Sequence, residues 1–229
     1  MYRAKCQPNH VLYHLSLDFA YSFIYGAGNN TPSLRFFTLF KRRYTMKCLY
    51  LHGFASAFDP DGGKVQTLKK NFDVIHFSYD TTMPYPQNMA RMSNIIKAHD
   101  VKIVVGCSLG GFYALEASKA TGVFAVALNP SYDPKNSMKN HIGSNKNYKT
   151  GKMEALTAQA VESYPLTVNT EANGIVLIEK GDAVINPNQS FKFFEKKYAT
   201  KLVAGGSHRF ESLEDNIDYV LTEFEKFTK

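Results

Sequence analysis

Short runs of apolar residues recur along most of the chain, and each run is closed by a turn-forming residue. Successive side chains within these runs are apolar and often Val, Ile or Leu, so an extended segment would bury both of its faces. This pattern predicts strands in the interior of a parallel sheet. The predicted strands cover residues 47–53, 72–80, 102–108, 123–130, 174–181 and 200–206.

Between the predicted strands, apolar residues recur every three or four positions, which is the spacing of one face of a helix. The clearest example runs from Leu213 through Val220 to Phe224, with Ser212 and Asp215 as a capping pair at its start. Strands that alternate with helices predict an α/β fold, with a mostly parallel sheet and helices on both faces. We expect the helices over residues 86–99, 109–120, 187–199 and from 213 onward.

Residues 131–168 interrupt this alternation, because they are too many for one crossover helix. Residues 131–152 are polar and loop-like, whereas 153–164 have the apolar spacing of a helix. An insertion of this length is often functional, and we expect a lid above the sheet. Residues 131–152 carry five lysines and one aspartate. Two interpretations are open, a solvated loop or a lid that attracts anionic substrates.

The charge of the chain is unevenly distributed. Six lysine or arginine residues and one aspartate lie within residues 1–45, so this segment carries +5 of the net charge of +7. A nucleic-acid-binding domain is expected to be basic across one face of its fold, so nucleic acid is not an expected partner. We expect residues 1–45 to be a poorly ordered, dispensable N-terminal extension and residues 46–229 to be the folded domain.

Composition favours a soluble globular protein, since 44% of the 229 residues are hydrophobic and 21% are charged. No run of 18 apolar residues occurs, so no membrane-spanning helix is expected. The three cysteines lie far apart and fit neither a disulfide framework nor a zinc site. They favour a reducing, cytoplasmic location, and no metal or other cofactor is expected.

Glycines surround one serine where a predicted strand meets a predicted helix. The five residues Gly106-Cys107-Ser108-Leu109-Gly110 match G-x-S-x-G, the sharp turn that exposes a nucleophilic serine. The pattern alone also fits a glycine-rich turn that holds a nucleotide phosphate. The chain contains no G-x-x-x-x-G-K-[ST] and no G-x-G-x-x-G after its first strand, which favours the nucleophile. Cys107 should point into the packing and be structural.

A nucleophilic serine needs a base, and the base needs a carboxylate to orient it. Among the seven histidines, His208 alone lies in a loop after the last predicted strand, at the carboxyl edge where the serine turn also opens. Asp182 follows the strand before it, which gives the chain order Ser, Asp, His of an α/β-hydrolase. Glu179 is the rival carboxylate, but it lies within the strand and is expected to point along or away from the sheet.

Two backbone N–H groups are needed to stabilise the negative charge of an oxyanion. Leu109 directly follows the serine and supplies one of them. The first predicted strand ends in the sequence LHGFAS (51–56), beside the serine strand, so the N–H of Phe54 is the expected second donor. Gly53 would permit the close approach of this loop.

These residues lie within motifs that resemble the YqiA/YcfP-like small bacterial esterases of the α/β-hydrolase superfamily, from about Met46 to the C-terminus. The motifs are LYLHGFAS, VVGCSLGGFYAL, ALNPSYDP with IGSNKNYKTG, EKGDAVIN and GGSHRF. The resemblance implies that Ser108 is the nucleophile, Asp182 the acid and His208 the base, with no metal or cofactor. We expect substrate contacts from other residues of these motifs, namely His52, Gly53, Asn129 and Tyr148.

The resemblance implies hydrolysis of small-molecule carboxylic esters or thioesters through an acyl-enzyme. Two alternatives remain open at this stage. An acyl-CoA thioesterase or an acyltransferase would use the same triad. A non-catalytic binding protein could retain the fold without the reaction. The oligomeric state and the natural substrate do not follow from the sequence.

Overall fold

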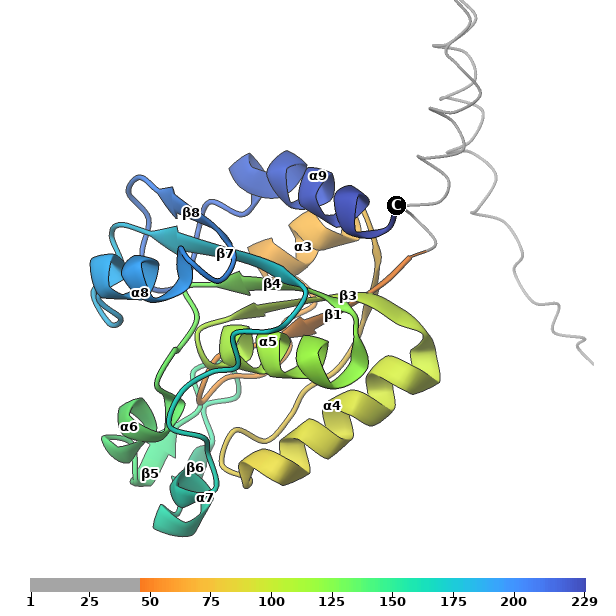
Figure 1. The fold of residues 1–229 in the computed structure, drawn as a ribbon. Helices are drawn as coiled ribbons and strands as arrows, with labels where there is room; N and C mark the ends of the chain where they lie inside the picture. Colours follow the sequence, from red (N-terminus) through yellow and green to blue (C-terminus); the bar gives the residue numbers. More distant parts are fainter. Residues whose placement is uncertain (1–45) are drawn as a thin grey trace, which may run out of the picture. The chain divides into compact units, whose positions relative to one another are not determined.

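The computed structural model describes residues 46–229, which are built around a six-stranded sheet (Figure 1). The strand order is β2-β1-β3-β4-β7-β8, and every neighbouring pair is parallel. The strands are β1 (Lys47–Leu51), β2 (Asp73–Ile75), β3 (Val101–Cys107), β4 (Phe124–Leu128), β7 (Gly174–Glu179) and β8 (Ala199–Val203).

Helices cover both faces of the sheet (Figure 1). One face packs under α4 (Tyr85–His99), α5 (Leu109–Thr121) and α8 (Pro187–Phe194), and the other under α3 (Gly63–Lys69) and α9 (Ile217–Phe227). Neighbouring residues of β1 divide between the two cores: Leu49 and Leu51 belong to the first, and Cys48 and Tyr50 to the second. This division explains the continuous apolar runs, and the predicted α/β fold with a parallel sheet is confirmed.

The second predicted strand is much shorter than residues 72–80, because β2 ends at Ile75. The residues that follow it hold the loop after β1 instead of extending the sheet. The Ser78 hydroxyl accepts a hydrogen bond from the N–H of Phe58 (2.8 Å), and the Tyr79 hydroxyl donates to the carbonyl of His52 (2.6 Å).

Two details near the C-terminus also differ from the prediction. Helix α8 ends at Phe194 rather than at residue 199, since Ala199 already begins β8. The predicted capping pair is wrong, because the Ser212 hydroxyl donates to Glu179 and a short 3₁₀ turn, η1 (Glu214–Asn216), precedes α9.

The insertion contains more regular structure than its sequence suggests. It holds α6 (Pro134–Lys139), the antiparallel hairpin of β5 (Gly143–Lys146) and β6 (Met153–Leu156), and α7 (Ala158–Glu162). The predicted helix over 153–164 is therefore wrong in its first half. Residues 153–156 pair with β5, and the Thr157 side chain accepts from the N–H of Ala160 to begin the helix only there.

The insertion follows the carboxyl end of β4 and reaches the loop after β1, where the N–H of Tyr148 donates to the carbonyl of Ala55 (2.7 Å). It therefore borders the carboxyl edge of the sheet. None of the helices formed by residues 46–229 has the length and apolar character needed to cross a membrane. The predicted N-terminal extension, residues 1–45, lies outside the described residues.

Candidate active site

Ser108 lies between β3 and α5 in a backbone conformation that side chains rarely adopt, with φ 58° and ψ −121°. Glycine is required on both sides of it. A Cβ on Gly106 would collide with the carbonyl of Gly110, and a Cβ on Gly110 would collide with the carbonyl of Leu51 on the neighbouring strand. The two glycines therefore allow the sharp turn, and the strain it imposes is of the kind found at functional sites.

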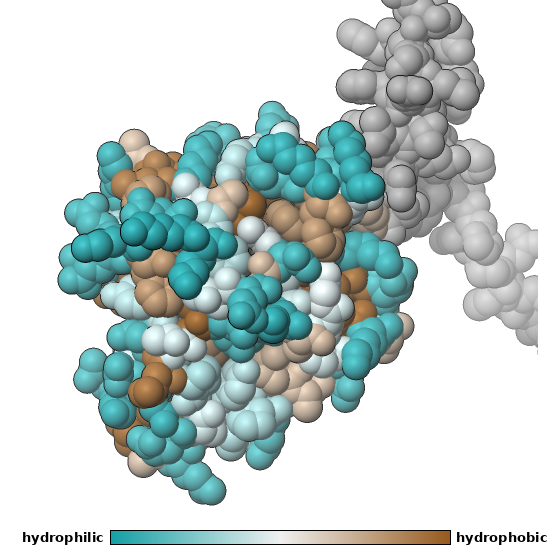
Figure 2. All heavy atoms as spheres, in the orientation of Figure 1, coloured by the Kyte–Doolittle hydropathy of each residue, from teal (hydrophilic) through white to brown (hydrophobic). Residues whose placement is uncertain are grey.

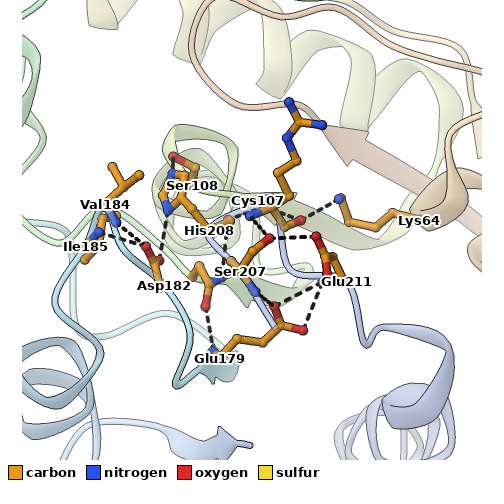
Figure 3. A network of polar contacts seen from close by, with 12 residues as sticks. Lys64, Cys107, Ser108, Glu179, Asp182, Val184, Ile185, Ser207, His208 and Glu211 are labelled. Carbon is orange, nitrogen blue, oxygen red and sulfur yellow. Dashed lines mark hydrogen bonds and ion pairs between the residues drawn. The ribbon is translucent and has the colours of Figure 1, made fainter. Parts of the chain in front are cut away.

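The structure brings the three predicted triad residues together (Figure 3). The Nε2 atom of His208 lies 2.8 Å from the Oγ of Ser108, and its Nδ1 atom lies 2.8 Å from Oδ2 of Asp182. The three side chains come from the end of β3, the loop after β7 and the loop after β8. One imidazole thus bridges a hydroxyl and a carboxylate, as a serine that is activated by a base requires.

The Asp182 carboxylate is almost completely buried and fully hydrogen-bonded. Its Oδ1 atom accepts the N–H groups of Val184 (2.8 Å) and Ile185 (2.9 Å), while Oδ2 faces His208. Burial alone would raise the pKa of Asp182, but the hydrogen bonds from His208, Ile185 and Val184 outweigh it and hold the pKa below its usual value. The group is therefore an anion at neutral pH.

Glu179 holds the loop that carries His208, a role that sequence reasoning missed. Its side chain is fully buried, and its carboxylate accepts the N–H groups of Ser207 (2.8 Å), Glu211 (2.9 Å) and Ser212 (2.8 Å) and the Ser212 hydroxyl (2.6 Å). Burial raises its pKa, but these donors outweigh burial and lower the pKa below its usual value. The expectation that Glu179 points along or away from the sheet is wrong, since it points at the loop (Figure 3).

Asn129 braces the same loop through both polar atoms of its side-chain amide. It is buried, its Oδ1 atom accepts the N–H of Glu179 (2.8 Å), and its Nδ2 atom donates to the carbonyls of Ser207 (2.8 Å) and His208 (3.2 Å). Its amide is committed to the protein, so the predicted substrate contact from Asn129 is not supported.

His52 is also packed into the protein. Its ring is buried and stacks on Tyr79, with ring centroids 4.4 Å apart. Its Nδ1 lies 3.0 Å from the carbonyl of Gly53, which can only accept, so Nδ1 carries the proton and Nε2 accepts the N–H of Tyr79 (3.4 Å). Burial lowers the pKa of His52 to about 4. Both ring nitrogens are thus in use, which argues against the predicted substrate contact from this side chain.

The two predicted oxyanion donors lie beside the serine. Strands β1 and β3 are neighbours, with Leu51 opposite Gly106, and a Cβ added to Gly53 would be only 3.5 Å from the Cβ of Ser108. Within residues 46–229, no hydrogen-bond acceptor takes the N–H of Phe54 or of Leu109. Both N–H groups are therefore available for an acceptor from outside the chain.

Ser108 and His208 open into a cleft of about 760 Å³. The insertion supplies part of its wall through Met138, His141 and Tyr148, and Tyr148 is 80% exposed. Hydrophobic side chains interrupt the hydrophilic surface in the region of the insertion (Figure 2). In the part of the chain that the structure describes, no three His, Cys, Asp or Glu side chains form a group that could hold a metal ion.

Cys107 is buried, as predicted from its place before the serine. Its Sγ atom lies 3.4 Å from the carbonyl oxygen of Arg209 and 3.7 Å from that of His208. Burial raises its pKa to about 11. A thiol that is protonated at neutral pH is a poor nucleophile, which argues against Cys107 as the reactive group of this turn.

The model of one protein family, described as "Uncharacterised protein family (UPF0227)", matches residues 47–225. The chain belongs to this family. A UPF0227 protein of Serratia proteamaculans (strain 568) is 24% identical over 178 residues, which are 75% of this chain and 95% of the relative. The resemblance to the YqiA/YcfP group is thereby confirmed.

Solved structures with the α/β-hydrolase fold resemble this UPF0227 chain. Est1E from Butyrivibrio proteoclasticus has a TM-score of 0.61 at 14% identity, over 83% of this chain and 93% of Est1E. The monoacylglycerol lipase of Paleococcus ferrophilus has a TM-score of 0.53 at 16% identity, over 80% and 96%. The enol-lactonase of Burkholderia xenovorans LB400 has a TM-score of 0.55 at 11% identity, over 82% and 94%. At these identities they establish the fold alone.

Proposed function

We propose that this UPF0227 protein is a serine hydrolase that cleaves carboxylic esters or thioesters through an acyl-enzyme intermediate. The observation that carries the proposal is the His208 ring, which is 2.8 Å from both Ser108 and Asp182. The names of two structural neighbours, a monoacylglycerol lipase and an enol-lactonase, agree with hydrolysis of ester bonds.

In the acylation step, Oγ of Ser108 bonds to the carbonyl carbon of the ester while its proton moves to Nε2 of His208. The Nδ1–H of His208 stays hydrogen-bonded to Asp182, whose negative charge stabilises the imidazolium. The N–H groups of Phe54 and Leu109 stabilise the oxyanion. The bond from carbon to the leaving oxygen then breaks, and Nε2 of His208 donates its proton to the departing alcohol.

In the deacylation step, Nε2 of His208 takes a proton from water as its oxygen bonds to the acyl carbon. The bond to Oγ of Ser108 breaks, His208 returns the proton to Oγ, and a carboxylic acid leaves. A thiol leaving group would follow the same route. An acyltransferase would differ only in the acceptor, an alcohol in place of water. Residues 131–168 would act as a lid over this cleft.

Covalent labelling tests the proposal directly. A fluorophosphonate should label the protein, with the label mapped to Ser108 by mass spectrometry, and the protein should hydrolyse 4-nitrophenyl acetate. Ser108→Ala should abolish both. Ser137→Ala is the matched control, because Ser137 also lines the cleft, but among the described residues its hydroxyl contacts Ser131 and the carbonyl of Pro134 instead of a histidine. An unlabelled Ser108 in the folded protein would favour a non-catalytic binding protein.

A further inference from the structure

The cleft has an excess of positive charge that the triad does not use. Lys64, Lys149 and Arg209 line it, against one carboxylate, Asp59. Lys149 is already paired with Asp59 at 2.8 Å. Across residues 46–229, neither Lys64 nor Arg209 forms an ion pair with a carboxylate. The nearby anions Asp182 and Glu179 are buried and hydrogen-bonded to other groups, so both cations are unpaired at the cleft.

The two cations lie on the His208 side of the cleft. Arg209 directly follows His208, and the ammonium of Lys64 donates to the carbonyl of Arg209 at 2.6 Å. Figure 3 shows Lys64 reaching this loop from α3. Burial raises the pKa of Cys107 and the Lys64 charge opposes this effect, which is consistent with a Lys64 ammonium close to the serine turn. Lys64 is half-buried and held in place, whereas the Arg209 side chain is exposed.

The proposed chemistry says which part of a substrate meets these cations. His208 must donate a proton to the leaving oxygen, so the alcohol part of an ester lies on the His208 side of the scissile carbonyl. A negative group on that part would approach the unpaired side chains of Lys64 and Arg209. Guanidinium and ammonium groups form charge-assisted hydrogen bonds with carboxylate and phosphate oxygens alike.

We propose that Lys64 and Arg209 form a subsite for a carboxylate or phosphate group on the alcohol part of the ester substrate. This inference rests on the proposed hydrolase function and specifies its substrate class. It also places the binding site for an anionic group at Lys64 and Arg209, and not at the lysine-rich residues 131–152 that the sequence suggested. Lys149 is neutralised by Asp59, and Lys146 does not line the cleft.

The test compares two acetate esters that differ by one charge, phenyl acetate and 3-acetoxybenzoate. The quantity measured is the ratio of kcat/KM for the anionic ester to kcat/KM for the neutral one. The ratio cancels any general loss caused by disturbing the His208 loop. Lys69→Gln is the matched control, because Lys69 lies on the same helix and also donates to a backbone carbonyl, that of Pro60 at 2.9 Å, but does not line the cleft.

At low ionic strength the unaltered protein should favour 3-acetoxybenzoate, and salt should reduce this preference. Lys64→Gln and Arg209→Gln together should lower the ratio about tenfold, and each alone by less, as expected for charge-assisted contacts that are partly exposed to water. Lys69→Gln should leave the ratio unchanged. An equal ratio in the double variant and the unaltered protein would overturn the subsite.

Two further comparisons sharpen the result. A phenyl acetate that carries a phosphate in place of the carboxylate distinguishes the two anions, and the better substrate identifies the group. Mono-4-nitrophenyl glutarate, compared with 4-nitrophenyl butyrate, places the charge on the acyl part. If the double variant lowers only the ratio of kcat/KM for the glutarate ester to kcat/KM for the butyrate ester, the anion is bound on the acyl side and the alcohol-side assignment is wrong. If phenyl acetate is not hydrolysed and Ser108 is not labelled, the hydrolase proposal fails, and the subsite with it.

Discussion

At the scale of single residues, the site separates two carboxylates with different surroundings. Asp182 presents one oxygen to His208, whereas both oxygens of Glu179 accept hydrogen bonds from the loop that carries His208. A carboxylate whose acceptor sites are filled by backbone N–H groups cannot also orient an imidazole. The geometry therefore supports the proposed orienting role of Asp182, whereas Glu179 holds the loop in place.

The triad assignment predicts large losses from small changes. Ser108→Ala, Asp182→Asn and His208→Ala should each lower kcat for 4-nitrophenyl acetate by about 10⁴-fold, the usual scale for a serine triad. The folded state should survive, which circular dichroism will check. Near-native turnover in Asp182→Asn alone would mean that another carboxylate orients His208.

Glu179→Gln should have a smaller effect of a different kind. The new amide places a donor against the N–H groups of the loop, so His208 loses its support but not its hydrogen bond to Asp182. We expect kcat to fall about tenfold to a hundredfold with KM nearly unchanged, and the protein to be destabilised by about 1–3 kcal/mol. Assays well below the melting temperature separate the two effects. An unchanged kcat in the fully folded variant would contradict a positioning role.

At the scale of elements, the central strands β1, β3, β4 and β7 were predictable because each buries both faces, which requires a continuous run of apolar residues. The hairpin of β5 and β6 was not, since β5 reads Gly-Ser-Asn-Lys and is a strand only because β6 pairs with it. The braces at Glu179 and Asn129 were missed for a related reason. Their partners come from a loop about 28 to 78 positions away, and no local pattern encodes such a contact.

The insertion is fastened to the loop that would supply an oxyanion donor. The Nδ2 of Asn147 donates to the carbonyl of Ser56 (3.0 Å), next to the contact between Tyr148 and Ala55, while its Oδ1 accepts the N–H groups of Lys149 and Thr150. Asn147 is buried, so its loss would leave these groups without partners.

Asn147→Ala should therefore loosen both the insertion and the loop over residues 54–59. We expect faster amide hydrogen exchange in that loop and a loss of about tenfold in kcat/KM, because the Phe54 N–H would no longer be held in place. Asn145→Ala is the matched control, since within residues 46–229 its amide donates only to the nearby carbonyls of His141 and Gly143. Equal exchange in both variants would show that the fastening does not order the loop.

At the scale of the whole molecule, residues 46–229 account for both cores. Helices α3, α4, α5, α8 and α9, which cover the two faces of the sheet, lie within this range, and the family match spans residues 47–225. The protein shortened to residues 46–229 is expected to fold and to hydrolyse 4-nitrophenyl acetate at a rate within about twofold of the full chain, since every residue of the proposed site is retained. Insolubility or loss of activity would show that residues 1–45 are needed.

The buried His52 makes the stability of the folded domain depend on mildly acidic pH. Burial lowers its pKa from 6.5 to about 4, so between these values the unfolded chain binds a proton that the folded protein does not. The contribution of His52 to the free energy of unfolding is therefore fully present above about pH 6.5. It is lost as the pH falls, by about 3 kcal/mol at pH 4. The lowered pKa values of Asp182 and Glu179 act in the same direction, but only at more acidic pH, as the pH falls below the ordinary values of carboxyl groups.

Urea unfolding at a series of pH values between 7 and 4 measures this dependence. His52→Gln should be less stable than the unaltered protein at pH 7, because the ring stacks on Tyr79 and bonds to Gly53, yet its stability should change less between pH 6.5 and 4.5. If the free energy of unfolding of the His52 variant falls with pH as steeply as that of the unaltered protein over this interval, His52 does not cause the pH dependence. Another group then controls the acid sensitivity of the fold.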